Sequence, residues 1–151
     1  MNTPSPAPNL APSPDQSARI LLKELQEKFD VFRDVQPLAI GIDKQLLASQ
    51  PELPRKVLRI ALRMHTNSLR YLKTMEKAAV RLNLDGTPAD PVTEDHRNHA
   101  SETLRERAQK HAAQRKLQRA AEEAQRKADA AAAQHAEKLN QLAAKFSRHG
   151  N

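Results

Sequence analysis

The stretch that most constrains this chain is residues 94–149, which contain no glycine and no proline but fifteen alanines. Helix propensity summed over so long a window predicts one continuous helix. Thr93 is a suitable N-cap, and the carboxylates of Glu94 and Asp95 match the positive end of the helix dipole. The few large apolar residues do not sustain an a/d heptad, so a long coiled coil is not expected. We predict a solvated helix that docks on a core only in its first turns, around Leu104.

The core must therefore lie earlier in the chain. Residues 18–93 hold 27 large apolar residues, whereas residues 94–151 hold five. Residues 1–17 carry five of the ten prolines and a single charge, and such a composition cannot bury enough surface to offset the entropy of ordering. A length of 151 residues suits one domain with extensions. We predict a disordered tail over 1–17, a folded domain over 18–115 and a basic helical extension over 116–151.

Apolar spacing and helix breakers in the core region favour an α+β fold that is mainly helical, with a short β element. The expected helices cover residues 18–30 with Ser17 as a cap, a short stretch to about Ala48 with Asp43 as its cap, 55–65 and 69–78, with a break at 66–68. Val80, Leu82 and Leu84 alternate with polar residues and run into Asp85-Gly86, which predicts a strand entering a hairpin turn. Residues 38–42 are short and apolar and fit either a strand or a buried turn.

Composition argues against catalysis. The chain has no cysteine, and its three glycines cannot build a phosphate-binding loop. His96 and His99 are the only closely spaced histidines, and nothing nearby completes a metal site of the usual kind. We therefore expect no enzyme, no cofactor, no metal and no small-molecule substrate.

The location follows from two further features. No apolar run approaches the roughly 18 residues of a membrane helix, so we expect no membrane contact. The first ten residues lack the basic and apolar regions of a secretory signal. The expected location is the cytoplasm.

Positive charge is concentrated in one window. Residues 54–81 hold eight basic residues and one acid, whereas residues 94–151 carry both signs and sum to +4. The basic residues of the window are Arg55, Lys56, Arg59, Arg63, Arg70, Lys73, Lys77 and Arg81. Arg55, Arg59 and Arg63 follow one another at intervals of four, which places them on one helix face roughly 6 Å apart along the axis. Three guanidinium groups in a row suit the tracking of phosphates, although a solvated helix face is the alternative.

Tyr71, Arg81 and the helix break at 66–68 could also belong to the binding surface. Tyr71 is either a core residue with a wet hydroxyl, or a residue that stacks on a base or donates to a terminal phosphate or hydroxyl. Arg81 lies on the polar side of the expected strand and could project toward the same surface. Thr66, Asn67 and Ser68 are either a helix break and cap, or residues whose hydroxyls and amide bind a phosphate or a ribose hydroxyl.

Four sequence segments resemble the ProQ/FinO family of bacterial RNA-binding proteins. They are QPLAIGI at 36–42, the L-R-x-A-L-R helix and the T-x-S-x-x-Y-L segment within PRKVLRIALRMHTNSLRYLKTM at 54–75, and the LDG turn within AVRLNLDGTPADPV at 79–92. Their order and spacing are compatible with the family over roughly residues 18–115. The chain resembles a minimal member with a single such domain.

The resemblance implies binding of structured RNA, in particular the 3′ stem-loop of a terminator with its single-stranded uridine tail. It implies annealing of small regulatory RNAs with their targets, and strand exchange. The family's duplex-binding helix face falls on Arg55, Arg59 and Arg63, with Lys56 beside it, and its pocket for the RNA 3′ end falls on Thr66, Arg70, Tyr71 and Arg81. Many members are basic where this chain has Gln36 and Ala39, and Lys44 could supply the missing contact.

Two other functions compete with RNA binding. Residues 43–49 and 55–65 could form a helix-turn-helix for DNA, but the intervening turn holds two prolines and the second helix lacks Asn and Gln for reading adenine. The 94–149 helix could instead drive self-association in a scaffold protein, which the poor heptads disfavour, so we expect a monomer.

Overall fold

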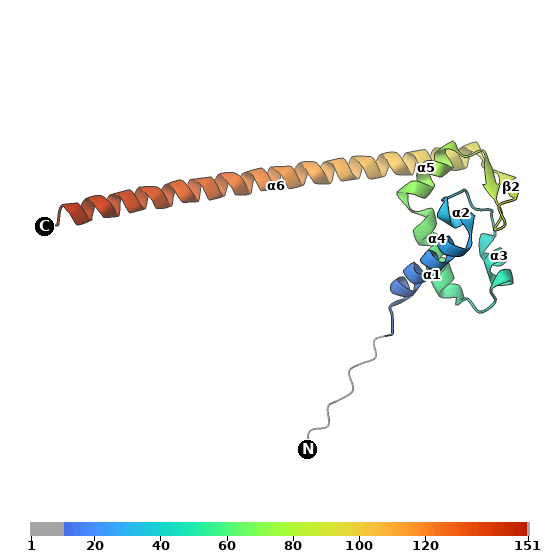
Figure 1. Ribbon diagram of the computed structural model, residues 1–151. Helices are drawn as coiled ribbons and strands as arrows, with labels where there is room; N and C mark the ends of the chain where they lie inside the picture. Colours follow the sequence, from blue (N-terminus) through green and yellow to red (C-terminus); the bar gives the residue numbers. More distant parts are fainter. Residues whose placement is uncertain (1–10, 151) are drawn as a thin grey trace, which may run out of the picture. The chain divides into compact units, whose positions relative to one another are not determined.

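The computed structural model describes residues 11–150 of the chain. Its elements are α1 (Pro14–Lys28), α2 (Asp30–Arg33), α3 (Ile42–Ser49), α4 (Arg55–Thr66), α5 (Leu69–Lys77), β1 (Val80–Leu82), β2 (Pro88–Pro91) and α6 (Glu94–Arg148) (Figure 1). The expected α+β class, mainly helical with a short β element and a long C-terminal helix, is confirmed. The chain divides into two units, Met1–Arg105 and Glu106–Asn151.

The first helix begins earlier than the sequence predicted. Ser13, not Ser17, is the N-cap: its hydroxyl accepts from the Gln16 amide, and the Gln16 side chain accepts from the Ser13 amide. Pro14 occupies the first turn, where its missing N–H and fixed φ cost nothing. Residues 14–17 are therefore helical, and the disorder expected for them is wrong. Residues 1–10 of the expected tail lie outside the described residues.

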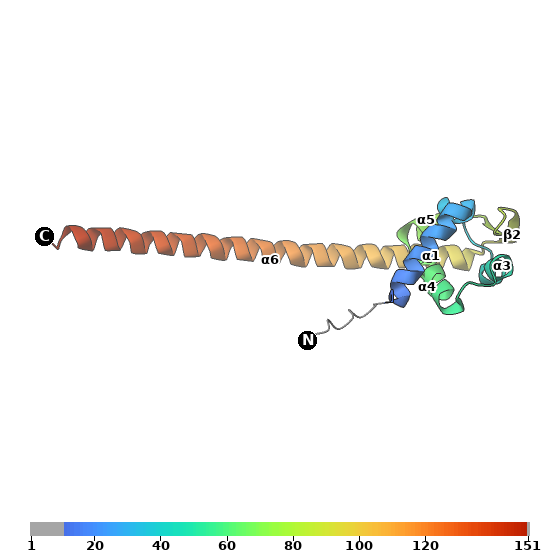
Figure 2. The ribbon, with the colours of Figure 1, turned by 60° about the horizontal axis from the view of Figure 1, so that its bottom comes forward.

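The core of the first unit is built on α1 and α4, which pack against each other and lie side by side in both ribbon views (Figure 1, Figure 2). Leu25, Phe32, Leu46 and Leu58 are the largest side chains that are fully buried. Burial of each of these side chains stabilises the fold by roughly 1.5–3 kcal/mol. Ile20 of α1 is an exception among the large apolar residues of this helix, because it is 56% exposed.

A short helix that the sequence analysis did not predict turns the chain after α1. α2 ends in a C-cap in which the Gln36 amide donates to the Val31 carbonyl and the Val35 amide to the Phe32 carbonyl. This motif needs a left-handed residue, and the residue there is Val35, with φ of 54°. A β-branched residue in this conformation costs about 1–3 kcal/mol, and the burial of its side chain holds it in place.

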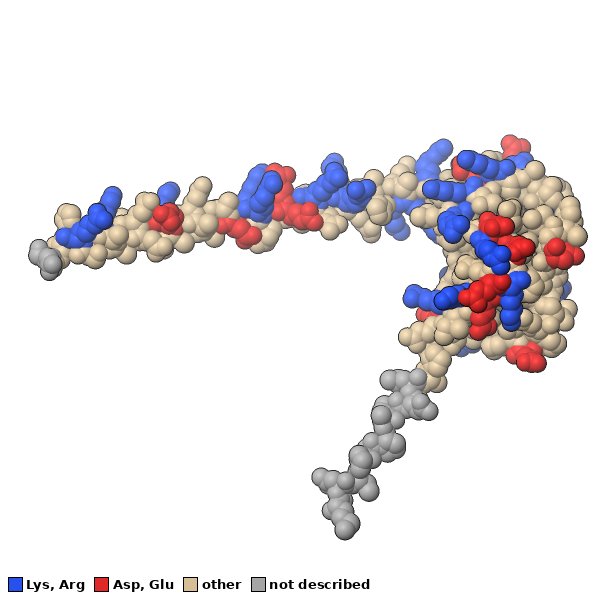
Figure 3. Space-filling view, in the orientation of Figure 1, with Lys and Arg blue, Asp and Glu red and all other residues tan. Residues whose placement is uncertain are grey.

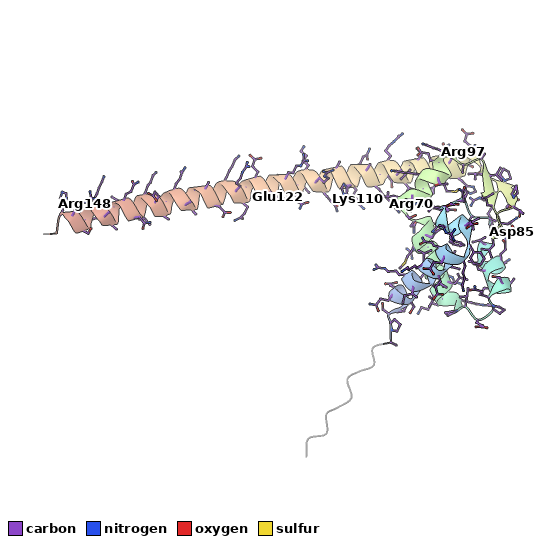
Figure 4. All side chains as sticks on the ribbon, viewed as in Figure 1. Arg70, Asp85, Arg97, Lys110, Glu122 and Arg148 are labelled. Atoms are coloured by element: carbon purple, nitrogen blue, oxygen red, sulfur yellow. The ribbon has the colours of Figure 1, made fainter. Side chains whose placement is uncertain are left out.

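The β element is a two-stranded antiparallel hairpin that pairs Val80 with Pro91 and Leu82 with Pro88. Its turn holds Asp85 (Figure 4) and Gly86, whose φ is +87°. The hairpin expected from the Asp-Gly pair is thus confirmed, but β1 ends at Leu82 and Val80 is 40% exposed, so the apolar alternation overstated the strand.

Residues 38–42 combine the two structures expected for them. Leu38 forms an isolated parallel bridge with Leu82, and the Ala39 amide donates to the Leu82 carbonyl at 2.8 Å. Gly41 then adopts φ of 83° as the N-cap of α3, a role that had been assigned to Asp43. Glycine has no Cβ, so Gly41 adopts this left-handed conformation without a steric cost.

α6 is one helix from Glu94 to Arg148, as the absence of breakers predicted. Thr93 caps it, since its hydroxyl accepts from the His96 amide. Ala100 is buried and Leu104 is half-buried, whereas every described residue from Ala108 onward is exposed. No helix among residues 11–150 is both long and apolar enough to cross a membrane.

Candidate nucleic-acid interface

α4 separates apolar from basic side chains. Leu58, Ala61 and His65 face the core, and Arg55, Lys56, Arg59 and Arg63 are all exposed. Within residues 11–150 the ion pairs are Arg33–Asp30 and Lys127–Glu123, so none involves an arginine of α4. The three arginines at intervals of four, called the arginine stripe below, therefore form an exposed row of guanidinium groups with no acid bound to them.

The arginine stripe ends at a turn of three polar residues. Thr66 is the last residue of α4, and its hydroxyl donates back to the Leu62 carbonyl at 2.9 Å. Ser68 caps α5 by accepting from the Tyr71 amide, and its hydroxyl donates to the His65 carbonyl. These hydroxyls are used to end one helix and begin the next, which is the structural role that the sequence left open for them.

A small cavity of about 290 Å³ lies at this turn, and we call it the Tyr71 cavity. Its lining residues are Thr66, Asn67, Tyr71, Leu72, Met75, Arg81, His96, His99 and Ala100. They come from the end of α4, from α5, from β1 and from the first turns of α6, so four elements of the first unit converge here. Its volume is at the small end of the range for ligand sites.

Leu38 fixes the two polar side chains expected to be functional in this cavity. Its amide donates to the Tyr71 hydroxyl at 3.1 Å, and its carbonyl accepts from Arg81 Nη1 at 3.0 Å. The Tyr71 ring is buried, with 6% exposed, so it has no face on which a base could stack. Because the hydroxyl oxygen accepts from Leu38, its own proton is available to donate. The burial matches the first interpretation of Tyr71, a core residue. Of the second interpretation, stacking on a base is removed, and donation by the hydroxyl stays a prediction.

His65 lies beneath the cavity wall as a core residue. Its ring packs between Phe32 and Tyr71, at centroid distances of 5.0 and 5.4 Å. It is 3% exposed, and burial lowers the pKa of its imidazole to about 4. The ring is therefore neutral at physiological pH and supports Tyr71 from behind.

The structure brings together some of the residues that the resemblance assigned to one pocket. Thr66, Tyr71 and Arg81 line the Tyr71 cavity. Arg70 is exposed on α5 (Figure 4) and is not among the lining residues. Lys44 is exposed in the first turn of α3, an element that contributes no residue to the cavity.

Two histidines, which the sequence brought to attention only as possible metal ligands, belong to the cavity wall. His96 Nδ1 lies 3.2 Å from Arg81 Nη2, and His99 lines the same cavity one turn later. No group of three metal-ligating side chains occurs in the described part of the chain. The sequence shows how far these histidines lie from the Thr93 cap. It does not show the contact of His96 with Arg81, because that contact depends on the packing of α6 against β1.

A second row of basic residues on α6 was also missed. Arg107, His111, Arg115 and Arg119 repeat the interval of four, and no acid occurs between residues 107 and 121. The next position in this register is Glu123, which pairs with Lys127 at 2.8 Å. Figure 3 shows both signs of charge along the helix, and in Figure 4 Lys110 lies within the basic segment and Glu122 just after it. The same count that found the arginine stripe would have found this row.

Three comparisons relate the chain to known proteins. A model of the ProQ/FINO family matches residues 16–117. The RNA chaperone ProQ of Idiomarina loihiensis is 40% identical over 99 residues, which are 64% of this chain and 48% of that protein. The RNA chaperone ProQ of Shewanella amazonensis is 40% identical over 85 residues, which are 54% of this chain and 39% of that protein. The chain thus spans about half the length, or less, of the curated relatives it matches.

A solved structure agrees with this likeness. The crystal structure of a FinO-like RNA chaperone from Neisseria meningitidis MC58 superposes with a TM-score of 0.53 at 29% sequence identity. The match covers 55% of this chain and 88% of that one.

Proposed function

Because the chain belongs to the ProQ/FinO family, we propose that it is an RNA-binding protein and RNA chaperone rather than an enzyme. One observation supports this proposal most directly. The arginine stripe runs along α4, and the last residue of this helix, Thr66, is itself part of the wall of the Tyr71 cavity. A surface that suits the phosphates of a duplex therefore continues into a small cavity with polar donors.

The ligand we propose is a stem-loop followed by a single-stranded uridine tail with a free 3′ end. A-form duplex is bound mainly through its shape and its phosphates, which suits the arginine stripe. The end of the tail offers hydroxyl and phosphate oxygens, which suit the Tyr71 hydroxyl and the Arg81 guanidinium. Through such binding the protein would anneal small regulatory RNAs with their targets and promote strand exchange, acting as a monomer in the bacterial cytoplasm.

The first experiment is a binding titration of the full chain at one near-physiological salt concentration. The ligands are a GC-rich RNA hairpin with a U tail, the same hairpin without the tail, and a DNA duplex of equal charge. Preference for the tailed hairpin supports the proposal. Equal affinity for all three would reduce the basic face to a general polyanion surface, and preference for the DNA duplex would support the helix-turn-helix alternative.

A variant series separates the stripe from bulk charge. Arg59→Ala and Arg63→Ala should weaken binding of both RNA hairpins alike. Each should also reduce the slope of log K against log salt by about 0.7–0.9, the value for one lost phosphate contact. Arg19→Ala, at an exposed position of α1, is the matched control and should leave the slope almost unchanged. If Arg59→Ala and Arg63→Ala change the affinity and the slope no more than Arg19→Ala does, the arginine stripe is only a solvated helix face.

A further inference from the structure

The ring of His96 lies within hydrogen-bond distance of two polar side chains. Its ring Nδ1 lies 2.9 Å from the Thr93 hydroxyl and 3.2 Å from Arg81 Nη2. The Thr93 hydroxyl in turn accepts from the His96 amide at 3.3 Å. Both groups therefore contact the same ring nitrogen, one from the cap of α6 and one from an arginine of β1.

These contacts determine which ring nitrogen carries the proton. A guanidinium can only donate, so Nδ1 must be the acceptor, because a proton on Nδ1 would face the N–H of Arg81. The neutral imidazole then carries its proton on Nε2. Among residues 11–150, no hydrogen bond involves Nε2 of His96. His96 also lines the Tyr71 cavity, so this donor is within the residue's reach of a ligand bound there.

Arg81 is held by the same arrangement. Its Nη1 donates to the Leu38 carbonyl and its Nη2 to His96, while its Nε is buried without a partner. Two bonds to two different elements fix the plane of the guanidinium before any ligand arrives. Fixing it in advance reduces the entropy lost on binding.

We propose that His96 is a specificity-determining residue of the RNA site. It positions Arg81 through Nδ1, and it donates a hydrogen bond through Nε2 to an acceptor oxygen of the terminal nucleotide. This inference rests on the proposed function, because it deepens the description of the Tyr71 cavity as the site of the RNA end.

Two substitutions separate the two ring nitrogens. His96→Asn keeps an acceptor near the position of Nδ1 and has no atom near Nε2. His96→Gln reaches the position of Nε2 with an amide but leaves Arg81 without its acceptor. The measured quantity is the Kd of the full chain for the tailed and untailed RNA hairpins. His135→Asn, at an exposed position of α6, is the matched control, and thermal unfolding verifies that each variant is folded.

We expect each His96 variant to weaken binding of the tailed hairpin by roughly threefold to tenfold, the contribution of one hydrogen bond, and to leave the untailed hairpin unchanged. The proposal is wrong if both variants bind the tailed hairpin as the wild type does. If only His96→Gln loses affinity, direct donation through Nε2 is overturned. A wild type that shows no preference for the tail would refute the proposed function itself, which is a distinct outcome.

The tautomer can be tested without RNA. Nitrogen-15 NMR of the free protein near neutral pH should show His96 with an unprotonated Nδ1 and a protonated Nε2. The opposite tautomer would overturn the proposal regardless of any binding result.

Discussion

His65 should make the stability of the domain depend on pH in a window where few other groups titrate. The imidazole is buried between two aromatic rings, and its Nε2 has no hydrogen-bond partner. Burial lowers its pKa from 6.5 to about 4. Above pH 6.5 neither the folded nor the unfolded chain holds the proton. Between pH 6.5 and about pH 4 the unfolded chain binds a proton that the folded chain excludes. The free energy of unfolding therefore falls as the pH falls through this range.

The size of the effect follows from the size of the shift. Each pKa unit corresponds to about 1.36 kcal/mol, so the shift removes about 3 kcal/mol in total once the pH is below both values. About 2 kcal/mol of this is already lost at about pH 5. A small domain is stable by about 5–15 kcal/mol, so the loss is easily measured.

The assay is urea unfolding of the wild type and of His65→Phe at about pH 7.5 and about pH 5. Phenylalanine keeps a ring against Phe32 and Tyr71 but cannot bind a proton. We expect the wild type to lose about 2 kcal/mol more than the variant on acidification. The other five histidines are exposed or at the chain end and are shared by both proteins, so they cancel in the comparison. Equal losses in the two proteins would refute the burial argument.

The remaining predictions concern the helices and the extension. Ser13→Ala should destabilise the domain by about 1 kcal/mol in urea unfolding, because it removes the α1 cap, and Ser13→Asp should restore most of the loss. Leu25→Ala should cost roughly 2–5 kcal/mol in the same assay, and a cost below about 1 kcal/mol would mean that its site is not closely packed. Deletion of residues 116–151 should leave the urea midpoint of the domain unchanged, since every described side chain there is exposed, and should slow RNA duplex formation if the basic extension screens repulsion between strands. A shifted midpoint, or an unchanged rate, would contradict the respective half of this expectation.

The sequence predicted those elements that depend on local chemistry. α6 follows from propensity and the absence of breakers, and α4 from an amphipathic pattern that ends at a polar turn. The start of α1 was misplaced because Ser13 and Ser17 are both acceptable caps. Only the reciprocal bond with Gln16 decides between them.

The candidate site was less accessible to sequence reasoning. Composition and spacing located an exposed basic surface, whereas the grouping of Thr66, Tyr71 and Arg81 came from the family resemblance. The burial of the Tyr71 ring and the contact between Arg81 and His96 depend on how β1 and α6 pack, and no local pattern encodes that packing. Val80 was misjudged for a related reason, because alternation does not reveal where a short strand ends.

The double role of Leu38 bears on when the site forms during synthesis. Its two partners in the cavity lie 33 and 43 residues further along the chain, at Tyr71 and Arg81. Contacts of such separation form late, because the intervening chain must first be ordered. The arginine stripe belongs to a single helix and needs no such closure. A nascent chain emerging from a ribosome therefore carries the row of guanidinium groups well before the cavity is complete, and the cavity closes only after the first turns of α6 have been made.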